Sequence, residues 1–478
     1  MRAGRIVKGR TITHCKGQSA EIGSIMGDIV NYSVFSRFHS EVGKFNLKGK
    51  RLLIPDMAPF GARLLASCFR AFDVDAVVME TYRGLDLGKA YTSGKECFPC
   101  QITLGDILLH LKREKERLGS AFDPNRYVYF LPESDGPCRF GMYNKLQRLV
   151  LDSFPEFKNV RIAYLSTGDA YSTEGILPEE DASIFRKLAF VSTVAADVMD
   201  RITWRARPYE SRKGSVDQLV REVLAHMEKV IEARGRELPF GEIFDLLGEA
   251  AREASNLVDR SIPRKPLIGI VGEIYLRTHP ASNQGLIRKI EEYGGEVVDA
   301  SLVEWISFVS YERLRKLGRE IKHSWNIKAL KKLKELARSW ASLALEVAWQ
   351  NLRQYQGYRR ALTHLDIEPD HTVWRIERYL KRYDLFSFEI GTEAALSIGG
   401  AIAYVAEGFN GIVNVFPFTC MPSTICSAIL KPILQRLRIP FIDLAYDGSV
   451  QPGRDMAIRT FIYQAQQHQK QQQKRHPG

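Results

Sequence analysis

Short apolar runs alternate with longer amphipathic stretches in two parts of the chain. In the first part the strand-sized runs, rich in β-branched and aromatic residues, are 51–55, 75–79, 127–131 and 161–165. The stretches between them carry apolar residues at helical spacing, as in 60–72. Strands that alternate with helices form parallel βαβ units, so this pattern predicts a doubly wound α/β lobe over residues 47–181.

The same alternation returns after residue 265. The strand-sized runs of this second part are 267–271, 296–299, 412–416 and 440–444. Helical periodicity without strands fills 182–264 and 310–382, and in the latter it continues through Leu330, Leu333, Leu336 and Trp340. We therefore expect an α/β fold of two doubly wound parallel-sheet lobes, the second over 265–465, with a helical connector or cap at 182–264 and a helical insertion at 310–382.

The two ends of the chain lack the alternation. Residues 1–46 are basic and polar, which predicts an irregular N-terminal arm without a secretory signal. Residues 466–478 are rich in Gln, His and Lys, which predicts a disordered tail. The longest apolar runs are only strand-sized, so we expect no membrane span and a cytoplasmic location.

Composition and charge narrow the function only slightly. The 478 residues are 45% hydrophobic and 26% charged, as in ordinary globular proteins of two or three domains. The net charge of +12 suits an acidic partner, a phosphate-bearing cofactor or RNA. No aromatic-rich RNA-binding segment accompanies the charge, so we expect no specific nucleic acid. In the basic insertion, a helix that binds a membrane surface or a partner is an alternative to a purely buried face.

The cysteines carry the clearest chemical signal. Seven is an odd number, and clustered cysteines in an intracellular chain indicate metal binding or catalysis more often than disulfides. Cys97, Cys100, Cys138 and Cys420 each precede a predicted helix, in a turn reached from the end of a strand. The turns after parallel strands share one edge of the sheet, so we expect these four thiols to converge. Helix N-termini also favour thiolates.

Residue spacing alone leaves several kinds of site open. A four-cysteine zinc site usually uses two C-x-x-C pairs, whereas Cys138 and Cys420 stand alone. A redox disulfide between Cys97 and Cys100 would leave the other two cysteines unexplained. An iron–sulfur cluster suits scattered thiolates at helix N-termini, because backbone N–H groups stabilise its negative charge. Small buried cysteines without any metal are the remaining alternative.

Four motifs carry a resemblance to a known family. They are 91–97 (YTSGKEC), 135–143 (DGPCRFGMY), 269–275 with 282–284 (GIVGEIY and SNQ), and 416–422 (FPFTCMP). With these motifs in this order, the chain from about residue 48 to 465 resembles the iron–sulfur proteins related to 2-hydroxyacyl-CoA dehydratases. It is most similar to the portion found joined to, or beside, the dehydratase activase.

The resemblance implies a 4Fe-4S cluster and a role in ATP-driven, low-potential electron transfer or in reductive chemistry on an acyl-CoA. It implies that Cys97, Cys138 and Cys420 hold the cluster, with Cys100 the next candidate. The activase's own ATPase domain is missing, since the sequence has no phosphate-cradling glycine loop. ATP hydrolysis is therefore expected from a separate ATPase activase or redox partner.

Two further expectations concern the second lobe. Glu273, Arg277 and His279 follow the strand at 267–271, where a parallel sheet binds ligands, and are candidate substrate-binding residues. An arginine there suits a carboxylate or phosphate, although a structural salt bridge is equally compatible with the pattern. Cys97, Cys100 and Cys138 would come from the first lobe and Cys420 from the second, which places the cluster between the lobes.

The number of thiolates separates the function classes. Four thiolates would give every iron of the cluster a protein ligand (a closed cluster), which favours an electron-transfer or activator component. Three would leave one iron open, which favours a dehydratase-like or reductase-like enzyme that binds an acyl-CoA. The C-x-x-C spacing of Cys97 and Cys100 favours the closed cluster. A zinc-stabilised binding protein is a third possibility.

Overall fold

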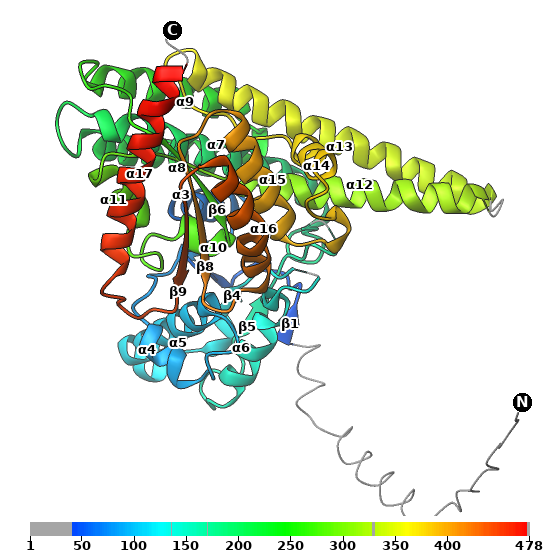
Figure 1. The fold of residues 1–478 in the computed structure, drawn as a ribbon. Coiled ribbons are helices and arrows are strands. Elements are labelled where there is room, and N and C mark those ends of the chain that lie inside the picture. Colours follow the sequence, from blue (N-terminus) through cyan, green and yellow to red (C-terminus); the bar gives the residue numbers. More distant parts are fainter. Residues whose placement is uncertain (1–40, 135, 170, 327–329, 476–478) are drawn as a thin grey trace, which may run out of the picture.

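The computed structural model describes residues 41–475 except 135, 170 and 327–329, so most of the predicted N-terminal arm lies outside it. Two parallel sheets organise these residues (Figure 1). Strand order is β1-β5-β4-β2-β3 in the first sheet and β7-β6-β8-β9 in the second. Every strand pair is parallel and both faces of each sheet carry helices. The predicted α/β fold of two doubly wound lobes is thus confirmed.

The elements follow the predicted alternation. The strands are β1 (Val42–Gly43), β2 (Arg51–Ile54), β3 (Asp75–Val78), β4 (Tyr127–Phe130), β5 (Arg161–Ala163), β6 (Leu267–Gly272), β7 (Glu296–Asp299), β8 (Gly411–Pro417) and β9 (Phe441–Tyr446). The helices up to the second lobe are α3 (Pro59–Arg70), α4 (Leu85–Ala90), α5 (Phe98–Leu118), α6 (Tyr143–Asp152), α7 (Glu179–Ala206), α8 (Ser215–Arg234) and α9 (Phe240–Leu257). The later helices are α10 (Ile274–Thr278), α11 (Leu286–Glu292), α12 (Leu302–Asn326), α13 (Leu330–Leu362), α14 (Val373–Arg382), α15 (Glu393–Ala406), α16 (Met421–Leu437) and α17 (Arg454–Arg475).

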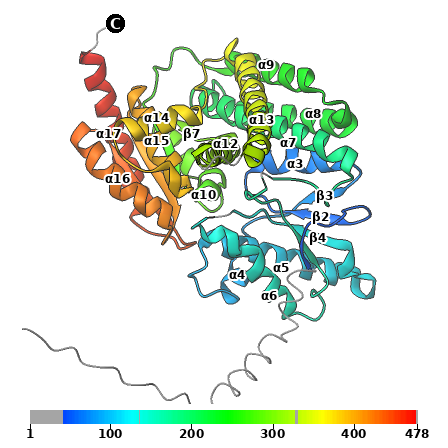
Figure 2. The same ribbon diagram turned by 90° about the vertical axis from the view of Figure 1, so that its right-hand side faces the viewer.

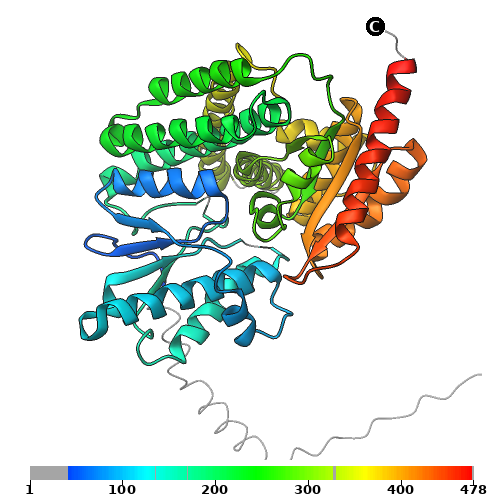
Figure 3. The same ribbon diagram turned by 90° about the vertical axis from the view of Figure 1, so that its left-hand side faces the viewer.

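Alternate residues of the first sheet build two different cores. Leu53 and Tyr129 pack toward α5 and α6, whereas Leu52 and Val128 pack toward α3. Helices α7 to α9 form a further layer over α3 and join the same core, as Figure 3 shows. The segment 182–264 is therefore helical as expected, and it covers one face of the first lobe.

The second sheet is covered in the same way. Ile268 and Val413 pack toward α11 and α17, and Ile412 packs toward α15 and α16. The lobes also touch directly, since Phe98 of α5 belongs to the same apolar cluster as Tyr446 of β9. Figure 2 shows the lobes side by side, with α12 and α13 beside both.

The C-terminal end departs from expectation. Residues 466–475, predicted as disordered, continue helix α17, and the rest of the predicted tail, 476–478, lies outside the described residues. The apolar residues Phe461 and Ile462 bury this helix against the second sheet. Gln469 then donates a hydrogen bond of 3.1 Å to the Arg264 carbonyl, and Gln472 accepts one of 2.8 Å from Asn410. Glutamine and lysine are good helix formers, so low complexity did not mean disorder here.

Three boundaries also differ from the predicted ones. Val42–Gly43, within the expected arm, pairs with β5 as an edge strand. A short helix, α4, lies between β3 and Cys97, ahead of the helix predicted after the cysteine. The helical insertion begins at Leu302 instead of 310. No helix in the described ranges has the length and apolarity needed to cross a membrane.

Candidate functional site

Three of the predicted cysteines lie directly at helix starts. Cys97 is the N-cap of α5 and Cys420 the N-cap of α16, each with a proline in the first helical turn. Cys138 is the N-cap of the short 3-10 helix Arg139–Met142, which leads into α6. Proline is preferred in a first helical turn because its missing N–H has no partner to lose there. Each cysteine therefore stands at a helix N-terminus, whose free N–H groups favour negative charge.

The sheets bring these helix starts to one place. Cys138 follows β4 at the point where the first sheet's order reverses, between β2 and β4. Cys420 follows β8 at the corresponding point of the second sheet, between β6 and β8. Ligands of parallel α/β sheets bind at such reversal points. Here the two points face each other across the lobe interface.

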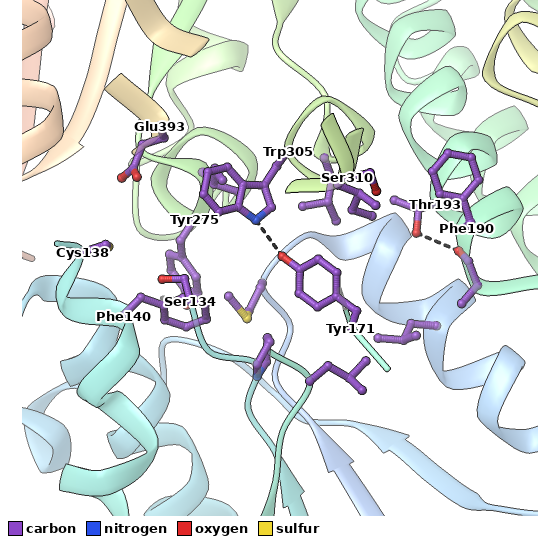
Figure 4. Close-up of a pocket in the computed structure, with 18 of the residues that line it drawn as sticks. Ser134, Cys138, Phe140, Tyr171, Phe190, Thr193, Tyr275, Trp305, Ser310 and Glu393 are labelled. Atoms are coloured by element: carbon purple, nitrogen blue, oxygen red, sulfur yellow. Dashed lines mark hydrogen bonds between the residues drawn. The ribbon is translucent and has the colours of Figure 1, made fainter. Parts of the chain in front are cut away.

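Cys97, Cys138 and Cys420 line a single cavity of about 620 Å³, together with Glu273 and Glu393. Figure 4 shows Cys138, Phe140 and Glu393 on one side of this cavity, and Phe190 and Thr193 on the other. Both lobes and helices α7, α12 and α13 contribute to its wall. A volume of this size lies within the usual range for small-molecule sites, roughly 300–1,000 Å³.

Cys100 does not line this cavity. Its side chain is fully buried in the apolar core between the first sheet and α5, where it continues the stripe formed by Leu104, Ile107 and Leu108. The structure thus brings three of the four predicted ligands to the cavity and leaves the fourth behind Cys97. Cys68 and Cys426 are also fully buried in apolar cores, and all six cysteines of the described chain are free thiols.

The electrostatics of the site oppose unassisted ionisation of the thiols. Burial raises the pKa of Cys97 and of Cys420 to about 12, and also raises that of Cys138. Glu393 adds to the rise at Cys138 and Cys420 because its negative charge disfavours a thiolate. Backbone N–H groups at the helix starts lower each pKa, but by less than burial raises it. The thiols are therefore neutral at physiological pH unless a cation joins them.

The guanidinium of Arg139 ties the three cysteine turns together. It donates one hydrogen bond to the Lys95 carbonyl, two residues before Cys97. Its other nitrogen donates to the Thr419 carbonyl at 2.5 Å and to the Thr419 hydroxyl at 3.3 Å, one residue before Cys420. Arg139 itself follows Cys138 directly. One side chain thus links all three turns, and its bonds to Thr419 cross from the first lobe to the second.

Two of these turns hold unusual backbone conformations. Cys97 has φ of 103° and Thr419 has φ of 68°, both in the left-handed region that residues other than glycine rarely adopt. Such conformations cost on the order of 1–3 kcal/mol each and persist only where surrounding contacts impose them. The Arg139 bonds and the packing of Phe98 into the lobe interface are contacts of that kind.

The rest of the cavity wall is mainly aromatic and aliphatic. The Trp305 indole N–H donates a hydrogen bond of 2.7 Å to the Tyr171 hydroxyl (Figure 4). Phe190 and Trp349 lie beside each other, with ring centroids 5.6 Å apart. The cavity therefore combines a sulfur- and carboxylate-bearing region with a larger apolar region, which suits a ligand that has one reactive end and an apolar remainder.

Of the three candidate substrate-binding residues, Glu273 lines the cavity, whereas Arg277 and His279 do not. Glu273 lines the cavity, and its carboxylate also caps α10 by accepting hydrogen bonds from the backbone N–H groups of Tyr275 and Leu276 at 3.1 and 2.9 Å. Burial raises the pKa of Glu273 to about 7. The Arg277 side chain is buried and faces Asp299 at 3.7 Å, outside the cavity lining.

His279 also lies outside the cavity lining. Its Nδ1 accepts a hydrogen bond of 3.1 Å from the Ser282 N–H, which leaves the proton on Nε2. Nε2 lies 3.0 Å from the Thr81 hydroxyl, and that hydroxyl in turn donates to Asp106 at 2.9 Å. Thr81 and Asp106 belong to the first lobe, so this chain of hydrogen bonds holds the lobes together. Burial lowers the pKa of His279 to about 4.

Three residues of the site had no distinct signal in the sequence. Glu393 follows the Thr392 cap of α15, and an acidic residue at that position usually indicates no more than a favourable helix start. Arg139 and Tyr143 belong to the motif around Cys138, but nothing in their spacing predicts that Arg139 reaches the second lobe. The Tyr143 hydroxyl acts on the Cys97 thiol, whose pKa it lowers.

No group of three or more His, Cys, Asp or Glu among the described residues has an arrangement that could hold a metal ion as the side chains stand. No protein-family model matches the chain, and a search of curated proteins likewise finds no match.

Proposed function

We propose that this protein binds a 4Fe-4S cluster through Cys97, Cys138 and Cys420, and acts on a small molecule held in the adjoining cavity. The observation that carries the proposal is that three thiols from three helix starts line one cavity of about 620 Å³, while Cys100 does not. When bound, the cluster would supply one-electron transfer and a Lewis-acidic iron.

The donor set, three cysteine thiols at one cavity, is of the kind that iron–sulfur clusters use. Helix N-termini at each cysteine suit the negative charge of a cluster. The neutral thiols would lose their protons on binding.

A three-thiolate site favours the enzyme over the electron carrier. The resemblance to 2-hydroxyacyl-CoA dehydratases then suggests an acyl-CoA, whose acyl end would reach the thiols while Trp305 and Phe190 contact its apolar part. Glu273 and Glu393 would orient a polar group of that ligand. A separate ATPase activase or redox partner would deliver low-potential electrons, and the cytoplasm is the location we propose.

Iron, sulfide and zinc analysis of anaerobically purified protein tests the cofactor. We expect iron and sulfide in equal amounts, strongly reduced by Cys97→Ser, Cys138→Ser or Cys420→Ser. The matched controls Cys68→Ser and Cys426→Ser, both in apolar cores, should retain full iron. Zinc in place of iron, or equal iron in every variant, would overturn the proposal.

Cys100→Ser separates the two function classes. If three thiolates hold the cluster, this variant keeps full iron, and adding an acyl-CoA to the reduced protein shifts the cluster's EPR signal. If Cys100→Ser loses iron as Cys97→Ser does, and thioesters leave the signal unchanged, the protein is instead an electron-transfer or activator component with a closed cluster.

A further inference from the structure

Helices α12 and α13 form a long antiparallel hairpin that projects from the body of the protein (Figure 1). The ends of the hairpin that join the body, here called its root, are buried at Val303 and Phe308 on α12 and at Tyr358 on α13. The last ion pair that ties α12 to the body joins Arg319 to Glu389, and the first on α13 joins Glu346 to Arg186. Between them, the described residues of the hairpin make no hydrogen bond or ion pair with the rest of the chain.

One face of α13 presents apolar side chains to solvent. Ala341, Leu345, Ala348, Leu352 and Tyr355 follow one another at alternating steps of four and three residues, and all are exposed. Leu345 is 74% exposed, Leu352 49% and Tyr355 60%. Alternating steps of three and four place side chains along one seam of a helix, which is the pattern that packs against a second helix. Nothing in the described chain covers this seam.

The charge of α13 indicates what could cover it. The helix carries seven lysines or arginines and two glutamates, and Glu346 is already paired with Arg186. Lys331, Lys332, Lys334 and Arg338 have no acidic partner among the described residues. Toward the root, Arg359 is exposed, whereas Arg360 pairs with Asp245 and Arg353 lies over the rings of Phe240 and Trp349. An acidic surface is the complement of this helix.

The same charges argue against two other occupants. A second copy of α13 would bring basic residues onto basic residues, whether the two helices ran parallel or antiparallel. An anionic membrane would satisfy the charge, but lipid insertion relies on a continuous bulky apolar face. The seam instead alternates alanine with larger side chains, and small residues let a second helix approach closely.

We propose that the seam of α13 from Ala341 to Tyr355, together with Lys331, Lys332, Lys334 and Arg338, docks an acidic amphipathic helix of a partner protein. Leu345 and Trp349 of α13 also line the cavity that holds the three cysteines. A docked helix would therefore lie at the rim of that cavity. The seam is defined without reference to the thiols, so the docking proposal does not depend on the identity of the cofactor.

A designed peptide tests the proposal with the full-length chain. The probe is a fluorescently labelled helical peptide. It carries Leu and Ala along one face, at alternating steps of three and four residues, and Glu at the positions on either side of that face. Its binding is measured by fluorescence anisotropy. We expect saturable binding that weakens at least tenfold between 50 and 200 mM salt. Leu345→Glu with Leu352→Glu should weaken binding at least tenfold, and so should Lys331→Glu with Lys334→Glu. The control Leu437→Glu, an exposed leucine on α16, should bind like the unmodified chain.

Other outcomes overturn the proposal in distinguishable ways. A peptide with Lys at the flanking positions that binds equally well would refute the charge argument. Vesicles of phosphatidylserine and phosphatidylcholine that bind the chain while the acidic peptide does not would identify a membrane as the occupant. Self-association that the Leu345→Glu variant abolishes would identify a second copy. Iron content should be unchanged in Lys331→Glu with Lys334→Glu, whose residues lie outside the cavity lining, and this separates the docking test from that of the cluster.

Discussion

Arg139→Gln is the substitution that most directly tests whether one side chain holds the three cysteine turns together. Arg139 donates to the Lys95 carbonyl in its own lobe and to Thr419 in the other. A glutamine is shorter and uncharged and cannot reach both. The variant should therefore let the turns of Cys97 and Cys420 separate while both lobes keep their cores.

The size of the effect follows from the bonds lost. A hydrogen bond from a charged donor contributes roughly 1.5–3 kcal/mol when buried, and the half-buried Arg139 should contribute less, about 1–2 kcal/mol. A free-energy change of that size shifts an opening equilibrium by roughly 5–30-fold. The backbone strain at Cys97 and Thr419 acts in the same direction, since relaxing either φ favours the open turn.

Alkylation of the metal-free protein by iodoacetamide, resolved by mass spectrometry for each cysteine, measures this opening. Cys97, Cys138 and Cys420 should react roughly 5–30-fold faster in Arg139→Gln. In Arg139→Lys the alkylation rates of the three cysteines should lie between those of the unmodified chain and those of Arg139→Gln. A lysine can reach one turn but lacks the two-pronged geometry of a guanidinium. The matched control is Arg113→Gln, which removes an exposed arginine paired with Glu80 within the first lobe.

Two results would refute this reasoning. Unchanged rates at all three cysteines would show that Arg139 does not restrain the turns. A parallel rise at Cys68 and Cys426, which lie in separate apolar cores, would show that the variant destabilises the whole fold instead.

Three other predictions address stability and activity. Burial raises the pKa of Glu304 from 4.5 to about 8, so the folded chain holds a proton that the unfolded chain releases. Stability should therefore fall as pH rises from 5 to 8, and Glu304→Gln should reduce that fall in urea midpoints compared at pH 5.5 and 8. Gly105→Ala should lower the melting temperature strongly, because its Cβ would lie 2.0 Å from the Gly84 carbonyl oxygen. Gly241→Ala, in open space on α9, should raise stability by about 0.5–1 kcal/mol. The purified chain should hydrolyse ATP no faster than a heat-treated sample, because it has no phosphate-cradling loop.

The sequence predicted the strands well because their signal is local. The run predicted at 296–299 coincides with β7, Glu296–Asp299, and the other predicted strands differ from the observed ones by one or two residues at their ends. β-Branched and aromatic runs between polar turns have few alternative structures. The prediction of a disordered tail was wrong because the deciding signal there is not local. Its composition indicated disorder, whereas tertiary contacts of Phe461 and Ile462 decide that α17 is helical.

The candidate site was predictable in part. That Cys97 and Cys138 lie together follows from the rule that the strands of one parallel sheet end at one edge. Cys420 belongs to the other sheet, and the rule does not say how the two sheets face each other. The same rule could not separate Cys100 from Cys97, because both precede the same helical pattern. The discriminating signal was present in the spacing: Cys100, Leu104, Ile107 and Leu111 form one apolar stripe of α5. Cys97 lies outside that periodicity, as a cap residue with positive φ.

Residues that act across the lobes were beyond any local pattern. Arg139 and Thr419 are separated by 280 positions, and nothing in either segment specifies the other. The distribution of the site over two lobes also couples ligand binding to the arrangement of the lobes. Because the thiols come from both lobes, a group that binds all three would bind only the closed arrangement and would stabilise it by mass action. Cofactor loading and closure of the cysteine turns would then be one event, with Arg139 biasing the metal-free chain toward the closed state before any metal arrives.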